Sequence, residues 1–245
     1  KIAIIETGKP PVTIRSTYPG YPEMFAQLLQ SGAADLEFST FTICDGEAFP
    51  SPDKIDGVLI TGSPAGVYEN HSWMTPLMAF IQQAAQSDTP IAGICFGHQA
   101  VAKALGGAVN KSKKGWGVGR HTYDLVETPD WMRTDQSEFS LAVSHQDQVL
   151  DLPNGAQVVA ASNFTPLAAL YYPTVPALTF QGHPEFDADF SSALYNVRRN
   201  NPLPDAQVDD AIDTLKSPCD NALVAEWITA FFRAHKVIGG AGLPS

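Results

Sequence analysis

The cysteine at position 95 stands in a segment whose residue types favour nucleophilic chemistry. The apolar run Pro90–Ile94 leads into Gly93-Ile-Cys95-Phe-Gly97. Two glycines around a nucleophile permit a sharp strand-to-helix turn, which presents the middle side chain at the carboxyl end of a sheet. A helix that starts beside the thiol favours the thiolate through its dipole and its free N–H groups. The segment predicts a reactive cysteine, and a structural cysteine between two packing glycines is the alternative.

A histidine and a glutamate two positions apart, His183 and Glu185, could serve such a thiol. They follow the predicted strand Ala177–Gln181. A thiol that cleaves an amide needs a base that stabilises the thiolate and then protonates the departing nitrogen, and imidazole suits both tasks near neutral pH. Residues two apart in a strand face the same way, so Glu185 can orient the imidazole as the acid does in other triads. Together with the cysteine segment, these residues predict a Cys95–His183–Glu185 triad.

The elements that must position these residues alternate between strands and helices in the first half of the chain. Short apolar runs predict strands at Lys1–Glu6, Leu36–Ile43, Val58–Thr61 and Pro90–Ile94. Helical periodicity predicts helices at Pro22–Ser31, Trp73–Ser87 and His98–Leu105. This alternation requires a parallel sheet with helices on both faces, and the nucleophile segment follows one of its strands.

The second half of the chain begins with closely spaced short strands and ends in helices. The predicted strands are Gly119–Val126, Leu141–Ser144, Gln157–Ser162, Pro166–Tyr171 and Ala177–Gln181. The predicted helices are Ala188–Arg199, Gln207–Lys216 and Asn221–His235. We expect a small antiparallel extension at the edge of the parallel core. The apolar stripe of the last helix is expected to pack on the domain, with a dimer interface as the alternative.

The length of the chain favours one α/β domain over residues 1–245. We expect its core at residues 1–186 and a helical extension at residues 187–245.

Composition and motifs exclude several classes of partner and cofactor. The net charge of −11 repels phosphate backbones, so nucleic acid is not an expected partner. No run approaches the roughly 20 apolar residues that span a bilayer, and the first residues do not form a signal peptide, so we expect a cytoplasmic protein. The wide spacing of Cys44, Cys95 and Cys219 fits neither a disulfide framework nor a zinc site. No metal-ligand spacing or nucleotide-binding loop occurs, so neither a metal nor a cofactor is expected.

Taken together, Gly93-Ile-Cys-Phe-Gly-His-Gln99 and Gln181-Gly-His-Pro-Glu185 resemble the class I glutamine amidotransferase family. The resemblance covers roughly Ile2–Phe186 and is strongest to the glutaminase domain of GMP synthase and to stand-alone γ-glutamyl peptidases. It implies a flavodoxin-like fold of three layers, with a mostly parallel central sheet flanked by helices. It also implies hydrolysis of a γ-glutamyl amide through a γ-glutamyl thioester, in which His183 is the base and Glu185 its orienter.

The same resemblance implies an oxyanion hole at the segment Ile60–Pro64. In the family, a glycine-rich loop at this place and the residue after the nucleophile donate backbone N–H groups to the oxyanion. The matching positions here are Gly62, Ser63 and Phe96. An ordinary Gly-Ser-Pro turn is the alternative for this segment taken alone.

The resemblance also implies residues that hold the substrate. Gln99 matches the family's glutamine in the nucleophile segment, and Ser144, His145 and Gln146 match the segment that holds the two ends of bound glutamine. His145 is therefore a rival base, but only His183 is followed by a Pro–Glu pair.

Three functions are compatible with the sequence. The first is hydrolysis of glutamine to glutamate and ammonia, with the ammonia passed to a separate synthetase. The second is a free-standing γ-glutamyl peptidase that acts on glutathione-like conjugates or γ-glutamyl metabolites. The third is a non-catalytic binding or regulatory member, against which the intact Cys95, His183 and Glu185 argue. A small molecule is the expected substrate, and a synthetase subunit or a second copy of the chain are the alternatives for a protein partner.

Overall fold

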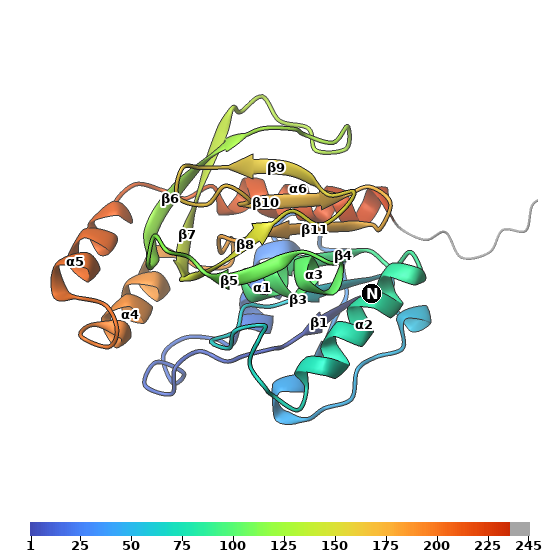
Figure 1. Ribbon diagram of the computed structural model, residues 1–245, viewed down its shortest axis with the longest axis horizontal. Helices are drawn as coiled ribbons and strands as arrows, with labels where there is room; N and C mark the ends of the chain where they lie inside the picture. Colours follow the sequence, from blue (N-terminus) through green and yellow to red (C-terminus); the bar gives the residue numbers. More distant parts are fainter. Residues whose placement is uncertain (236–245) are drawn as a thin grey trace, which may run out of the picture.

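The computed structural model describes residues 1–235, and a nine-stranded sheet in the order β2-β1-β3-β4-β11-β10-β9-β6-β7 forms its centre (Figure 1). The parallel strands are β2 (Phe38–Phe41), β1 (Ile2–Ile5), β3 (Gly57–Ile60), β4 (Ile91–Ile94) and β11 (Ala177–Phe180). The antiparallel strands are β10 (Ala169–Tyr172), β9 (Gln157–Ala161), β6 (Gly117–Leu125) and β7 (Glu138–His145). The predicted α/β class, with an antiparallel extension on a parallel core, is confirmed.

Helices cover both faces of the parallel core. They are α1 (Tyr21–Gln30), α2 (Met74–Gln86), α3 (Phe96–Ala104) and α6 (Asn221–Ala234). Because successive strand residues point to opposite faces, Ile4 packs in the cluster that holds α1 and α6, whereas Ile5 packs in the cluster that holds α2 and α3. Trp227 and Phe231 of α6 are buried against the sheet. The prediction that the apolar stripe of this helix packs on the domain is therefore confirmed.

Two further helices, α4 (Ala188–Arg198) and α5 (Asp205–Thr214), form a lobe beside the antiparallel strands at the left of Figure 1. Asp187 caps α4, because its Oδ1 accepts a hydrogen bond of 2.7 Å from the Phe190 N–H. Phe190 and Leu194 pack in an apolar cluster that includes Ala142 of β7. This packing fixes the carboxyl end of α4 next to the end of the sheet where Cys95 lies.

Some short elements differ from the predicted ones. The strands β5 (Ala108–Lys111) and β8 (Asp147–Asp151) form a separate antiparallel pair that the sequence did not predict, because both are short and largely polar. Helix α3 begins at Phe96 instead of His98. Two 3-10 turns lie at Ile43–Asp45 and Pro52–Lys54. The last ten residues of the predicted extension, 236–245, lie outside the described residues. Within residues 1–235, no helix combines the length and apolarity needed to cross a membrane.

Candidate active site

Cys95 occupies a strained turn between β4 and α3. Its φ of 53° and ψ of −100° lie outside the regions that most side chains adopt, and such strain persists only where the surrounding structure fixes it. A Cβ on Gly97 would lie 2.3 Å from the Ile60 carbonyl oxygen, and a Cβ on Gly93 would lie 2.7 Å from the Gly97 backbone. Both glycines are therefore required by the close approach of β3, β4 and α3. The predicted sharp turn is confirmed, and it holds a nearly buried thiol.

His183 and Glu185 form a buried pair. The His183 Nδ1 and the Glu185 Oε1 lie 2.7 Å apart, and the ring of Phe186 stacks on the imidazole at 3.9 Å between centroids. The prediction that these two residues continue a strand is wrong, because β11 ends at Phe180 and the chain then turns. The His183 N–H instead donates to the Ala142 carbonyl at 2.9 Å in an isolated bridge to β7. The turn brings the imidazole and the carboxylate together. The sequence predicted this pairing, but from the alternation of side chains in a strand.

Gly62 lies close to both His183 and Cys95. A Cβ at this position would lie 3.0 Å from the His183 Cε1 and 3.9 Å from the Cys95 Cβ. Burial disfavours a charged imidazole, but the negative charges of Glu185 and Cys95 outweigh burial and raise the pKa of His183 to about 10. An imidazole in this environment holds its proton next to the sulfur.

The second histidine of interest, His145, lies in a different electrostatic environment. Its Nδ1 is 3.1 Å from the Asp147 carbonyl oxygen. Burial, followed by the neighbouring His121, lowers the pKa of His145 to about 3, so this ring is neutral. Because no carboxylate within residues 1–235 hydrogen-bonds to this ring, the electrostatics favour His183 over His145 as the proton carrier.

Two glutamines connect the nucleophile to the neighbouring strands. The Gln99 Nε2 donates to the Asp147 carbonyl at 2.9 Å and to the Gln181 Oε1 at 3.2 Å. The Gln181 Nε2 donates to the Cys95 Sγ at 3.6 Å. Gln99 was singled out from the sequence, whereas Gln181 was not, although it is the first residue of the Gln-Gly-His-Pro-Glu motif. Its amide therefore helps to fix the position of the sulfur.

The residues expected to form an oxyanion hole lie beside the sulfur. Gly62 and Ser63 follow β3, and Phe96 is the first residue of α3. Within residues 1–235, no carbonyl or side chain accepts a hydrogen bond from the N–H of Ser63 or of Phe96, so both can donate to a ligand. The Ser63 Oγ donates to the Thr7 carbonyl at 2.8 Å, which fixes the loop. Ser63 is not among the residues with positive φ, so a serine fits this position without backbone strain.

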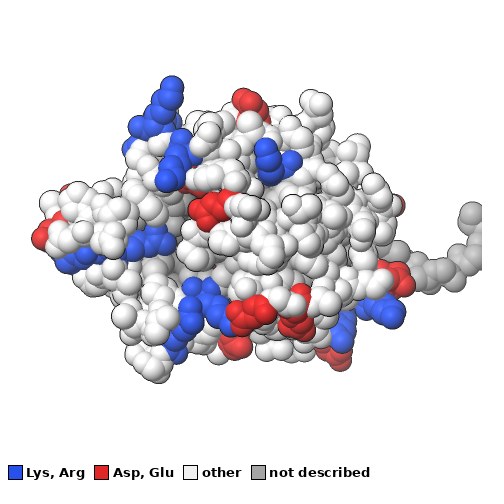
Figure 2. All heavy atoms as spheres, turned by 60° about the horizontal axis from the view of Figure 1, so that its bottom comes forward, with Lys and Arg blue, Asp and Glu red and all other residues white. Residues whose placement is uncertain are grey.

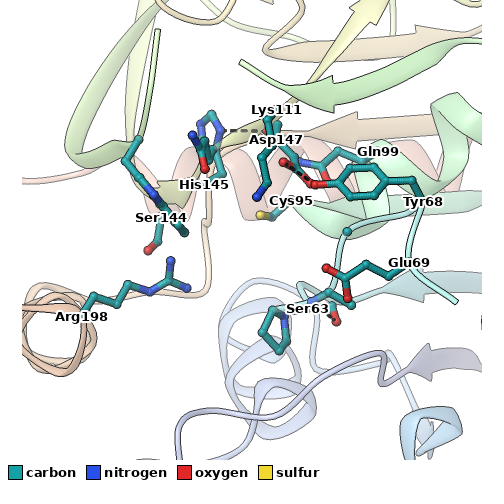
Figure 3. Close-up of a pocket in the computed structure, with 15 residues that line it drawn as sticks. Ser63, Tyr68, Glu69, Cys95, Gln99, Lys111, Ser144, His145, Asp147 and Arg198 are labelled. Atoms are coloured by element: carbon teal, nitrogen blue, oxygen red, sulfur yellow. Dashed lines mark hydrogen bonds between the residues drawn. The ribbon is translucent and has the colours of Figure 1, made fainter. Parts of the chain in front are cut away.

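Two cavities adjoin Cys95, and they share Ser63, Pro64, Cys95, Ser144 and Arg198. The first, here named the Gln99 cavity, has a volume of about 150 Å³ (Figure 3). Its other lining residues are Ala65, Gly66, Tyr68, Glu69, Gln99, Lys111, Trp116, His145, Gln146 and Asp147. The second, here named the His183 cavity, has a volume of about 260 Å³. Its other lining residues are Lys9, Pro11, Val12, Arg15, Tyr21, Gly62, His183, Phe186 and Leu194.

The structure brings together all the residues that the sequence singled out. The four expected to hold substrate line the Gln99 cavity: Gln99, Ser144, His145 and Gln146. The sequence missed Asp147, whose Oδ1 accepts a hydrogen bond of 3.2 Å from the Tyr68 hydroxyl, although it directly follows Gln146. It also missed Glu69 and Arg198, which come from segments without a recognisable pattern. Within residues 1–235, no group of three His, Cys, Asp or Glu side chains could hold a metal ion.

Comparison with known proteins places the chain in a family. The sequence profile of class I glutamine amidotransferases matches residues 18–193. The chain belongs to this family. A glutamine amidotransferase-like protein of Schizosaccharomyces pombe is 30% identical over 94% of this chain and 97% of its own length. Gamma-glutamyl peptidase 4 of Arabidopsis thaliana is 31% identical over 71% of each chain.

A solved structure shows the same fold. The glutamine amidotransferase of Thermotoga maritima superposes with a TM-score of 0.74 at 20% identity and covers 94% of this chain and 97% of its own. Class I glutamine amidotransferases are generally hydrolytic enzymes, which agrees with the buried thiol at the end of β4.

The space beside Gly62 leads to a first testable prediction for this member of the family. Gly62→Ala places a methyl group 3.0 Å from the His183 ring and displaces the imidazole, so we expect kcat to fall about 10- to 100-fold. Steady-state kinetics with a γ-glutamyl substrate measures the effect. Gly32→Ala is the matched control, because a Cβ there would meet no atom within 4 Å. Equal rates for the two variants would contradict the proximity of His183 to the reacting atoms.

Proposed function

We propose that this chain hydrolyses a γ-glutamyl amide bond, with Cys95 as the nucleophile, His183 as the acid and base, and Glu185 as the residue that orients His183. The convergence of Cys95 and the charged His183 around Gly62 carries the proposal. Membership in the class I glutamine amidotransferase family supports it.

The reaction that these residues support begins with attack of the Cys95 thiolate on the γ-carbonyl carbon. The oxyanion accepts hydrogen bonds from the N–H groups of Ser63 and Phe96. The tetrahedral intermediate collapses to a γ-glutamyl thioester, and the departing amine takes the proton from His183. Water then attacks the thioester and gives a proton to His183, which releases glutamate and restores the thiolate.

Glu185 acts in this scheme by orientation and charge. Its Oε1 accepts the hydrogen bond of the Nδ1–H and leaves the other ring nitrogen for the sulfur and the leaving group. Its side chain is fully enclosed, so its charge acts on the imidazole with little screening.

The chemistry of the leaving amine separates the candidate functions. Glutamine releases ammonia, which a synthetase subunit could consume. A γ-glutamyl peptide releases an amino acid or a peptide, and two observations favour this second candidate. The chain is similar to gamma-glutamyl peptidase 4, and the His183 cavity is larger than the Gln99 cavity, which gives a leaving group more than the space of an ammonia molecule.

A screen of the purified chain against glutamine and several γ-glutamyl amides tests the proposal, with Cys95→Ala as the inactive control. Turnover of peptides by the isolated chain supports a peptidase, whereas glutaminase activity that rises on addition of a synthetase supports an amidotransferase. Binding without turnover, unchanged by Cys95→Ala, would overturn the proposed hydrolysis.

The pH dependence of the reaction gives a second prediction. The raised pKa of His183 means that the imidazole keeps its proton as the pH rises through 6.5 and loses it only near pH 10. Because the protonated ring is the form that serves the leaving amine, we expect kcat/KM to decline only on approach to the higher pH. Initial rates across the alkaline range measure this decline. A fall in kcat/KM centred near pH 6.5 would show that His183 titrates as an ordinary imidazole.

A further inference from the structure

The charges around the His183 cavity differ from those of the whole protein. The chain carries a formal net charge of −11, yet Lys9, Arg15 and Arg198 line this cavity and no described Asp or Glu does. Figure 2 shows Lys and Arg side chains beside the notch between the α4–α5 lobe at the left and the rest of the protein. By contrast, Glu69 and Asp147 accompany Lys111 and Arg198 around the Gln99 cavity. One cavity has mixed charges and the other has only positive ones.

Arg198 has no carboxylate counter-ion among the described residues. The guanidinium lies 4.7 Å from the centre of the Trp116 ring, and this contact leaves its N–H groups available. Figure 3 shows Arg198 extending from α4 toward Ser144 and Cys95. A partly buried guanidinium that lines both cavities is suited to an anionic ligand.

The other two cations of the cavity differ in their availability. The Lys9 ammonium forms an ion pair with Asp45. The Arg15 Nε donates to the Pro10 carbonyl, and no carboxylate within residues 1–235 forms an ion pair with this guanidinium. In the described part of the chain, Arg15 is therefore a second cation of this cavity without a carboxylate partner.

We propose that the His183 cavity binds a leaving group that carries a carboxylate, with Arg198 and Arg15 as its cationic partners. This inference rests on the proposed γ-glutamyl hydrolysis and names its substrate class. His183, which gives its proton to the departing amine, lines only this cavity of the two, so the leaving group lies here. The Gln99 cavity keeps Lys111, Glu69 and Asp147, whose opposite charges suit the α-carboxylate and α-amino groups of the γ-glutamyl part.

The remaining lining residues of the His183 cavity indicate which side chain the leaving group carries beside its carboxylate. Pro11, Val12, Phe186 and Leu194 line it with apolar surface. An apolar side chain on the leaving group would remove this surface from water, whereas ammonia would use neither the apolar walls nor the cations. The substrate class is therefore a γ-glutamyl amino acid or γ-glutamyl peptide whose leaving residue is apolar and carries a carboxylate nearby.

The test compares three substrates: γ-glutamyl-leucine, its carboxamide γ-glutamyl-leucinamide, and glutamine. For the wild-type protein we expect kcat/KM to be about 10- to 100-fold higher for the carboxylate than for the carboxamide, the range that a charge-assisted hydrogen bond supplies. Arg198→Gln should remove most of this preference, and Arg198→Lys should keep part of it. Arg15→Gln should reduce the preference less, and because Arg15 is exposed this variant is not at risk of misfolding.

Arg199→Gln is the matched control. Arg199 is the next residue in the chain, but it pairs with Asp205 and Asp209 on the surface and lines neither cavity. We expect this variant to keep the full preference for the carboxylate. An equal loss for all three substrates in Arg198→Gln, with the preference unchanged, would show that Arg198 binds the α-carboxylate of the γ-glutamyl part and would overturn the inference.

Calorimetric binding to Cys95→Ala separates this inference from the proposed hydrolysis. Tighter binding of γ-glutamyl-leucine than of its carboxamide, without turnover of any substrate by the wild type, would refute the hydrolysis and leave the carboxylate subsite standing. Turnover of all three substrates at similar kcat/KM would refute the subsite and leave the hydrolysis standing.

Discussion

Replacing Cys95 with alanine lowers kcat for γ-glutamyl substrates by about 10⁴-fold or more, the effect expected when a covalent nucleophile is removed. The alanine variant should fold, because a methyl group fits where a nearly buried thiol lies at the amino end of α3. Steady-state turnover and the thermal unfolding midpoint, measured on the same preparations, separate lost chemistry from lost structure.

Cys44→Ala is the matched control for this variant. Cys44 is another free thiol, but burial raises its pKa to about 11, so it stays protonated at neutral pH and is a poor nucleophile. We expect Cys44→Ala to keep the wild-type kcat. A Cys95→Ala variant with appreciable turnover would mean that the reaction uses another nucleophile.

Replacing His183 with asparagine should lower kcat by about 10³-fold, because the variant can neither protonate the leaving amine nor activate water. The loss should be largest for substrates whose leaving amine is strongly basic, since these depend most on protonation. Rates for a series of γ-glutamyl anilides and alkylamides measure this dependence.

His145→Asn is the comparison that decides between the two histidines. The ring of His145 is neutral and contacts a backbone carbonyl, so its replacement should perturb substrate binding and raise KM more than it lowers kcat. If His145→Asn lost as much kcat as His183→Asn, the assignment of the base to His183 would have to be abandoned.

The parallel core and the nucleophile turn could be predicted because they depend on local patterns. Apolar runs, helical periodicity and the two glycines around Cys95 each reflect a constraint within a few residues of chain. The pairing of His183 with Glu185 was predicted from strand alternation, although the structure achieves it in a turn after β11. The two-residue spacing across Pro184 therefore predicted the pairing correctly, although the expected strand geometry was wrong.

The remaining parts of the site depend on contacts between distant segments. Arg198 reaches the cavities because α4 packs against β7, and nothing in the sequence around Arg198 distinguishes it from Arg199, which points to the surface. The strands β5 and β8 are too short and polar to produce a signal, yet they bring Lys111 and Asp147 side by side in register. Charge around a cavity is a property of the folded chain, so it could be recognised only from the structure.

Mass spectrometry of the acid-quenched reaction tests the central assignment of Cys95 most directly. Wild-type protein mixed with a γ-glutamyl substrate and quenched within the first turnovers should carry one γ-glutamyl group on the peptide that contains Cys95, in a bond that hydroxylamine cleaves as it cleaves thioesters. Substrate turnover with no such adduct on Cys95 when trapped this way, or with the group attached to another residue, would contradict the account.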